Sequence, residues 1–328
     1  MVTRLLLMIV LVVLPVNAQT MIHRRAHFRG VAGGTLTYVD VDYQNGSYYG
    51  VWGDGTFLYV AALNGGIKSY SYTAGGTLTY VDADFNPTQV RDVWGDGTYV
   101  YVAGSNGLST LTADGGGSLT YVDTDYQGSQ DYGGVWGDGT FIYVACGSEG
   151  LRSYSQSSGV LTFIDTDDQG SFYADVWGDG TFIYVAVSGA GVMTYSVDGG
   201  GALTYIDTAT NGSSSNCYGV WADASYIYVA GDVDGLETYS ADGGGNLTYV
   251  DTEDRGGNYY GVFGDGTYIY TACMDAGVRS HTVDGSGNIT YIDTDRQGTD
   301  QYRMVWSDGT LVFTACEAEG IRSYTVEP

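Results

Sequence analysis

The sequence predicts an all-β fold, a seven-bladed β-propeller whose blades are four-stranded antiparallel sheets. Two observations carry this prediction. A phrase that first reads Val51-Trp52-Gly53-Asp54-Gly55 recurs in seven near-copies, and the copies stand about 42 residues apart, which is the period of blade-type repeats. The composition, with 52 glycines and 31 tyrosines among 328 residues, suits short pleated strands joined by tight turns.

The first residues of the chain, 1–18, have the pattern of a secretory signal peptide. Arg4 precedes an apolar run from Leu5 to Val16, and Val16-Asn17-Ala18 supplies a cleavage site of small residues before Gln19. The run is short for a membrane span, so an uncleaved anchor is the less favoured alternative. We therefore expect a secreted protein, extracellular or at the cell surface, with no membrane span after signal cleavage.

Residues 19–35 are expected to form an N-terminal arm ahead of the propeller. His23, Arg24, Arg25 and Arg29 concentrate positive charge there, in an otherwise acidic chain. Such a segment is either a solvated tail or a basic arm (residues 19–30) through which copies of the chain bind one another head to tail.

Charge sets limits on the partners of this protein. Twelve basic residues face 38 acidic ones, and the formal net charge is −26. This field repels phosphate backbones, so we expect no nucleic-acid partner. It favours cations and basic partners instead.

The four cysteines are even in number, which permits disulfides in a secreted chain. Three of them, Cys146, Cys273 and Cys316, occupy the same repeat position. Equivalent points on neighbouring blades should lie beyond the ~7 Å Cα separation that a bridge allows. Small buried residues are therefore favoured over a disulfide framework.

Each repeat contains four strand-like runs, of which the first ends at Trp52 in the first copy. The Asp54-Gly55 pair then predicts a hairpin in which both central residues adopt positive φ. The second run, Thr56–Ala62, places apolar side chains on both faces, as expected of a sheet packed between two other sheets. The third and fourth runs are Gly66–Ser71 and Leu78–Asp82.

The order of the runs predicts how the ring closes. A strand of the fourth type, Leu36–Asp42, precedes the first complete set, and the chain stops after a strand of the third type, Gly320–Val326. We expect Leu36–Asp42 to be the outermost strand of the last blade. The propeller would then span residues 36–328, and closure would remove the exposed end faces of the stack.

The strand order resembles that of the LVIVD-repeat β-propellers. Ile142-Tyr143-Val144-Ala145, followed by Gly150-Leu151-Arg152-Ser153-Tyr154, carries the likeness, as do the six other copies. The resemblance implies the propeller fold and a role in surface or extracellular binding. The aspartate usual after that family's third strand is absent here, and Trp-Gly-Asp-Gly replaces its usual hairpin.

A ligand site is expected over the mouth of the central channel. The repeats disagree with one another at the two positions just before the repeated valine, and a repeated frame with differing loops is typical of a scaffold that presents a specific surface. Tyrosines and arginines there would suit a glycan or a protein partner, and drift in exposed loops is the alternative. The candidate ligand-binding residues are Tyr49, Arg91, Asp92, Asp175, Tyr218, Tyr260 and Arg303.

Acidic doublets end most of the fourth-type runs. In Asp165-Thr166-Asp167 the doublet leads into a glycine turn, which resembles the start of a calcium loop. The remaining regularly spaced ligands of such a loop are missing, so a solvated acidic rim is favoured and calcium at Asp165 and Asp167 is the alternative. We expect no other cofactor.

Four Asn-X-Ser/Thr sequences are candidate glycosylation sites in predicted turns. They begin at Asn45, Asn211, Asn246 and Asn288.

Catalysis is not indicated by any residue set. The chain has three histidines, His23, His27 and His281, and two of them precede the repeats, which leaves no Ser-His-Asp, Cys-His or three-histidine arrangement. We therefore expect the chain not to be an enzyme but a secreted scaffold for extracellular recognition of a glycan or protein. A self-assembling surface-layer or filament protein is the alternative, and a propeller hydrolase or lyase that uses Asp, Tyr and Arg is less favoured.

Overall fold

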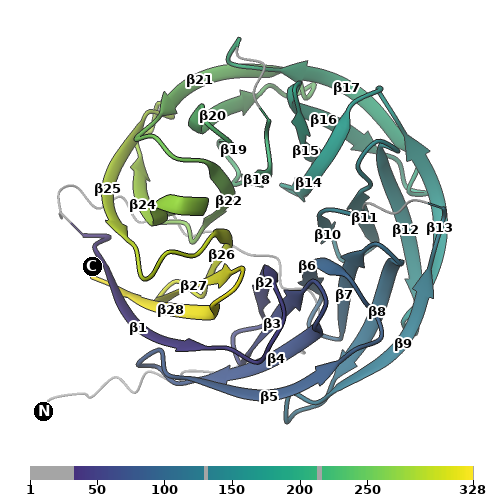
Figure 1. Cartoon of the computed structure of the whole chain (residues 1–328). Helices are drawn as coiled ribbons and strands as arrows, with labels where there is room; N and C mark the ends of the chain where they lie inside the picture. The colour runs from purple at the N-terminus through teal and green to yellow at the C-terminus, as the bar shows by residue number, and fades with distance from the viewer. Residues whose placement is uncertain (1–32, 129–131, 213–215, 328) are drawn as a thin grey trace, which may run out of the picture.

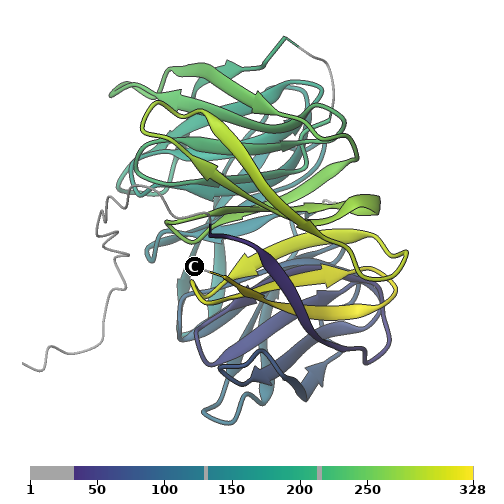
Figure 2. The same cartoon turned by 90° about the vertical axis from the view of Figure 1, so that its left-hand side faces the viewer.

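A computed structural model describes residues 33–128, 132–212 and 216–327. The predicted signal peptide and the whole basic arm (residues 19–30) lie outside the described residues. The described chain forms seven four-stranded antiparallel sheets arranged in a ring around a central channel (Figures 1 and 2). This confirms the predicted fold class and the number of blades.

Each blade runs from an inner strand beside the channel to an outer strand at the rim (Figure 1). Blades 1 and 2 hold β2 (Tyr48–Gly53), β3 (Phe57–Ala62), β4 (Gly66–Tyr72), β5 (Leu78–Asp84), and β6 (Val90–Gly95), β7 (Tyr99–Gly104), β8 (Gly107–Ala113), β9 (Leu119–Asp125). Blades 3 and 4 hold β10 (Val135–Gly137), β11 (Phe141–Ala145), β12 (Leu151–Ser157), β13 (Val160–Asp167), and β14 (Phe172–Gly178), β15 (Ile183–Ser188), β16 (Gly191–Val197), β17 (Leu203–Ala209). Blades 5 and 6 hold β18 (Gly219–Ala222), β19 (Ile227–Gly231), β20 (Gly235–Ala241), β21 (Leu247–Glu253), and β22 (Tyr259–Gly264), β23 (Ile269–Cys273), β24 (Gly277–Val283), β25 (Ile289–Asp295), with the 3₁₀ turn η1 (Met274–Ala276). Blade 7 holds β26 (Tyr302–Ser307), β27 (Leu311–Cys316), β28 (Gly320–Val326) and β1 (Leu36–Asp42).

The ring closes through β1, as the sequence predicts. This strand pairs antiparallel with β28, from Leu36 opposite Val326 to Asp42 opposite Ile321. The two strands lie side by side in Figures 1 and 2. The pairing extends slightly beyond the strand, since Gly34 donates its N–H to the carbonyl of Glu327 at 2.6 Å.

The Trp-Gly-Asp-Gly turns are hairpins, but their geometry differs from the predicted one. In the first copy only Gly55 has positive φ, at 87°, whereas Asp54 does not. The Asp54 carboxylate instead accepts the N–H groups of Thr56 and Phe57, and it also accepts the hydroxyl of Tyr59 at 2.9 Å. The Asp54 side chain, rather than a backbone carbonyl, is therefore the acceptor for these two N–H groups of the turn.

The repeated tryptophan and glycine meet at the boundary between blades. A Cβ atom on Gly95 would lie 2.6 Å from the Trp52 ring of the preceding blade, and one on Gly53 would lie 2.5 Å from Trp306. The second of these contacts joins the last blade to the first. The glycine of each phrase is thus required by the indole of the neighbouring phrase rather than by its own turn.

The outer strands are joined by an aspartate at one repeat position, which is the first aspartate of each acidic doublet and is Asp207 in the repeat without a doublet. Its carboxylate accepts the N–H that begins the outer strand of the next blade, at 2.8–3.0 Å, all round the ring. The donor–acceptor pairs are Leu36–Asp293, Leu78–Asp40, Leu119–Asp82, Leu161–Asp123, Leu203–Asp165, Leu247–Asp207 and Ile289–Asp251.

The four cysteines are buried free thiols, which agrees with the prediction of small buried residues. Burial raises the pKa of the Cys146 thiol to about 12, so it is an unreactive core side chain. Within the described ranges, no helix has the length and apolar character needed to cross a membrane.

Replacing Gly95 with alanine should destabilise the ring, because the new methyl group would overlap the Trp52 ring. We expect a loss of about 1–3 kcal/mol in unfolding free energy. Gly115 is the matched control, since a Cβ atom there meets no heavy atom within 4 Å. Denaturant unfolding of Gly95→Ala and Gly115→Ala measures both; equal stability of the two variants would contradict the packing argument.

Candidate functional site

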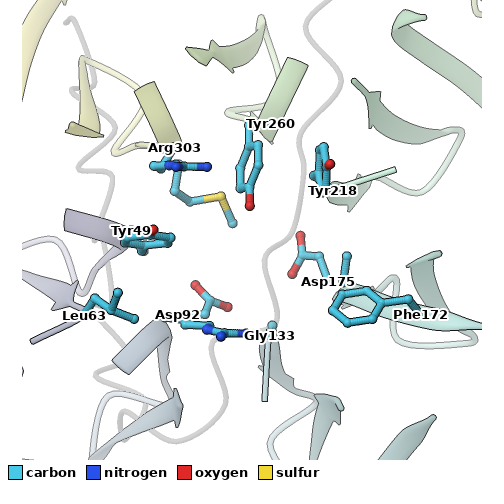
Figure 3. Close-up of a pocket in the computed structure, with 14 residues that line it drawn as sticks. Tyr49, Leu63, Asp92, Gly133, Phe172, Asp175, Tyr218, Tyr260 and Arg303 are labelled. Atoms are coloured by element: carbon cyan, nitrogen blue, oxygen red, sulfur yellow. The ribbon is translucent and has the colours of Figure 1, made fainter. Parts of the chain in front are cut away.

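The inner strands surround a cavity of about 390 Å³ at one end of the channel (Figure 3). Residues from all seven blades line it, including every residue predicted as a ligand surface: Tyr49, Arg91, Asp92, Asp175, Tyr218, Tyr260 and Arg303. The structure therefore brings the whole predicted set together. Whether these residues bind a ligand stays a prediction.

Backbone bulges direct several of these side chains toward the cavity. In five blades the pairing of the inner strand with its neighbour skips the residue two positions before the repeated valine. The skipped residues are Tyr49, Arg91, Ala174, Tyr260 and Arg303, and each of them lines the cavity. A bulge of this kind re-aims a side chain out of the ladder, so the same local irregularity presents a different residue from each blade.

One wall of the cavity is a stack of aromatic rings around an arginine (Figure 3). The Arg303 guanidinium lies 4.9 Å from the ring centre of Tyr49 and 4.8 Å from that of Tyr260. Tyr260 in turn stacks on Tyr218, with ring centres 4.4 Å apart and an interplanar angle of 19°. Blades 7, 1, 6 and 5 thus share one continuous cation–π and π-stacked surface.

Glu317 and Gln301 hold the arginine in this position. The Arg303 Nε donates to Glu317 Oε2 at 3.0 Å, and its Nη2 donates to Gln301 Oε1 at 2.7 Å. The side chain of Arg303 is 12% exposed. Its charge is therefore largely neutralised within the protein, and its main contribution to the cavity is a rigid planar surface.

The opposite wall carries two buried carboxyl groups, Asp92 and Asp175, that point into the cavity (Figure 3). They are 8% and 5% exposed. Asp92 accepts the N–H of Val135 at 2.9 Å, and Asp175 accepts the N–H groups of Val176 and Val220 at 2.8 and 3.0 Å. Each carboxyl group therefore bridges to the inner strand of the next blade.

Glycines provide the room for these carboxyl groups. A Cβ atom on Gly50 would lie 2.8 Å from Asp92 Oδ1, and one on Gly134 would lie 2.3 Å from Asp175 Oδ1. Both glycines occupy the same repeat position as the aspartates. An aspartate at this position thus needs a glycine on the blade before it.

Burial makes both acids hard to ionise. It raises the pKa of Asp92 to about 7, against the opposing effect of the backbone N–H groups of Val135 and Val93. The pKa of Asp175 is also raised well above its ordinary value, first by burial and then by the nearby charge of Asp92. Two carboxyl groups with raised pKa values in one cavity are typical of a functional site.

Leu63, Phe172 and Met304 also line the cavity and were not predicted. Met304 holds the position before the repeated valine, so the comparison of repeats exposes it. Leu63 and Phe172 lie at other repeat offsets, and only the packing of the loops brings them to the mouth.

The calcium site predicted at Asp165 and Asp167 receives no support from the structure. No group of three or more His, Cys, Asp or Glu side chains in the described part of the chain is arranged to hold a metal ion. Asp165 Oδ2 accepts the N–H of Leu203 at 2.9 Å, and Asp167 Oδ1 accepts the side-chain amide of Gln169 at 2.6 Å. The doublets also differ from a merely solvated rim, because their first carboxylates join neighbouring blades.

The four candidate glycosylation sites lie in turns and loops, and their modification stays a prediction. Three of the asparagines use their amide nitrogens in hydrogen bonds: Asn211 to Glu237, Asn246 to Asp242 and Asn288 to Asp284. Asn45 is exposed, with φ of 63°.

Comparison with known proteins identifies the fold class and no family. No family model matches the chain, and no curated protein matches it. The likeness to LVIVD-repeat proteins is therefore confirmed as far as the propeller and not as membership of that family. The chain belongs to the class of seven-bladed β-propellers with a pocket at the channel mouth.

Several solved structures share this fold. Virginiamycin B lyase from Staphylococcus aureus is 12% identical, with a TM-score of 0.68 over 89% of this chain and 99% of that one. A catalytically inactive histidine-to-alanine variant of the same lyase with quinupristin is 13% identical, with a TM-score of 0.67 over 89% and 99%. The computationally designed Ika8 protein is 9% identical, with a TM-score of 0.62 over 89% and 100%.

These neighbours correct the expectation that the chain is not an enzyme. That expectation rested on the lack of a serine-, cysteine- or histidine-based catalytic set, yet a lyase is built on the same ring of blades. The low identity means that the likeness shows the fold alone and assigns no reaction. Of the three histidines, His281 is fully buried on β24 and does not line the cavity, while His23 and His27 lie outside the described residues.

Asp92 should make the folded protein more stable at low pH than at high pH. Its pKa is about 7 in the fold and about 4 in an unfolded chain, so its stabilising contribution is complete below pH 4 and is lost as the pH rises through 7. The difference in unfolding free energy between wild type and Asp92→Asn should therefore shift by on the order of 2–3 kcal/mol between pH 5 and pH 8, in favour of wild type at pH 5.

Denaturant unfolding at the two pH values tests this expectation. Asp198→Asn is the control, because Asp198 is exposed in the β16–β17 turn, at the end of its blade away from the mouth. A wild-type-minus-variant difference that does not change with pH would show that Asp92 ionises normally.

Proposed function

We propose that this protein is a secreted β-propeller that binds a carbohydrate in the cavity at the channel mouth. One observation carries the proposal: the residues that differ between otherwise uniform repeats converge on one cavity with an aromatic wall and a carboxyl wall. A ligand site on a repeat scaffold needs variable residues that lie close together, and these residues meet that requirement.

The chemistry of the two walls favours a sugar. Tyrosine rings offer apolar faces for the C–H groups of a pyranose, and their hydroxyls, together with two carboxyl groups, offer donors and acceptors for sugar hydroxyls. The cavity volume of about 390 Å³ falls in the range of sites for small ligands. A loop of a protein partner would also enter such a cavity, and the experiment below distinguishes the two.

The leader sequence supports an extracellular location. Residues 1–18 combine a basic start, an apolar run and a small-residue cleavage site. The other partner predicted from sequence, a second copy bound through residues 19–30, involves a segment outside the described residues and stays a prediction.

A second candidate function is acid–base catalysis on the bound ligand, as in a hydrolase or a lyase. The observation in its favour is the presence of Asp92 and Asp175 in one cavity, where burial raises the pKa of Asp92 to about 7 and that of Asp175 well above its ordinary value. An acid that can donate a proton next to a carboxylate that can accept one is the minimum set for such reactions.

Tyr260→Ala should weaken glycan binding at least about tenfold, because Tyr260 lies at the centre of the stack between Arg303 and Tyr218. Arg303→Ala should have a similar effect, since it removes the group that positions Tyr49 and Tyr260. A glycan array identifies the ligand, and calorimetric titration then compares the variants.

Tyr80→Ala is the matched control, because this tyrosine is 37% exposed on the outer strand β5. It should bind the ligand as wild type does. Wild-type protein that binds no glycan, or binds one equally well without Tyr260 and Arg303, would refute the proposed site; capture of a protein partner in its place would favour the protein alternative.

The catalytic candidate predicts that wild-type protein converts the glycan it binds. Asp92→Asn and Asp175→Asn should each lower the rate at least about a hundredfold, since each removes one of the proton-transferring groups. Product formation followed by mass spectrometry measures the rate. A glycan that binds tightly and is recovered unchanged would leave binding as the function and exclude catalysis on that ligand.

A further inference from the structure

We propose that the ligand of the mouth cavity carries a free amino group, and that Asp92 and Asp175 together receive it as an ammonium ion. This inference rests on the proposed function and narrows its ligand class to amino sugars that are not acetylated. The carboxyl wall, the aromatic wall and the gap between the two aspartates each support it.

The gap comes from the order of the blades. Asp92 belongs to blade 2 and Asp175 to blade 4, and both stand one residue before the repeated valine. Between them, the part of blade 3 that the structure describes places Gly133 and Gly134 at the mouth, and neither glycine adds a side chain there. A ligand group can therefore enter between the two carboxyl groups, which point toward the same space (Figure 3).

The carboxyl groups keep hydrogen-bonding capacity for that group. An ionised carboxylate can accept about four hydrogen bonds. Backbone N–H groups use two of these at each aspartate, from Val135 and Val93 at Asp92 and from Val176 and Val220 at Asp175. An ammonium group has three donors and no acceptor. It therefore suits a pair of carboxylates better than a hydroxyl or an amide does.

Electrostatics favour a cation at this place. Burial disfavours the ionised form of each carboxyl group, and so does the negative charge of the other carboxyl group. A positively charged ligand group offsets both effects. The other charged and titratable groups around the cavity are Arg91, Arg303, Tyr49, Tyr218 and Tyr260. Arg303 is held by Glu317 on the far wall. Burial raises the pKa of the Tyr49 phenol, and the positive charges of Arg303 and Arg91 oppose this rise.

The tyrosines reinforce this preference rather than compete with it. Their ring faces attract cations, and Tyr49 and Tyr260 already hold the Arg303 guanidinium in this way. The sugar ring of an amino sugar would lie on the aromatic wall while its amino group meets the carboxyl wall. An acetamido group in place of the amine would lose the charge and bring a methyl group against two buried acids.

The test uses calorimetric titration at pH 7 with two probes that differ only in acetylation, the tetramer of β-1,4-linked glucosamine and its N-acetylated form. Wild type should bind the free amine at least about tenfold more tightly. Asp92→Asn and Asp175→Asn should each remove this preference, by weakening the binding of the free amine at least about tenfold, so that the two tetramers bind with similar affinity. Asp198→Asn is the control and should behave as wild type. Thermal unfolding establishes that the variants are folded.

Each outcome decides between this inference and the proposed function. Equal or tighter binding of the acetylated tetramer would overturn the inference and leave a carbohydrate site in place. If neither tetramer binds, the glycan array decides: an array ligand with a free amine supports the inference, and a neutral or acidic one overturns it. An array without any ligand would refute the proposed function and the inference together.

Discussion

The packing of an indole ring against a glycine at the boundary between blades is the contact on which this ring depends. It recurs from Trp52 on Gly95 to Trp306 on Gly53, so the last blade meets the first through the same contact that joins the others. Between blades 6 and 7 both partners of this contact change: Phe263 replaces the tryptophan, and Ser307 of the next blade replaces the glycine. The smaller ring leaves space for a larger neighbour. Trp177 faces Ala222 instead of glycine, and it donates its indole N–H to the Ala222 carbonyl at 3.2 Å.

Because these contacts fix the frame, the residues at the mouth are free to differ. The skipped residue of each bulge takes no part in the strand ladder, so it is tyrosine, arginine or alanine without cost to the blade. Asp92 and Asp175 are an exception, since each also bonds to the inner strand of the next blade. The carboxyl wall is therefore part of the ring structure and part of the cavity at once.

The repeat explains why the sequence predicted so much of this site. Once the period is known, the seven candidate residues stand one or two positions before the repeated valine, and a ring places equal offsets around one mouth. The contacts among them depend on blade order and on side-chain geometry instead. The sequence alone does not show that Arg303 lies between Tyr49 and Tyr260, or that burial raises the pKa of Asp92. The same limit applies to Asp54 and to Asp165. Their types suggested a two-residue turn and a calcium loop, whereas the structure uses their carboxylates to satisfy backbone N–H groups.

The two functions proposed for the cavity require different protonation states of the aspartate pair. Recognition of an amine requires the aspartate pair to give up its proton and hold two negative charges beside a cation. Catalysis requires the pair to keep one proton and pass it to the ligand. The raised pKa of Asp92 is compatible with both in the free protein, but the bound states are opposite. An ammonium group lowers the pKa of the carboxyl groups it touches, and a carboxylate so stabilised is a poor general acid. A strong preference for a free amine would therefore argue against proton donation by this pair, and the two proposals constrain each other through the charge of a single buried site.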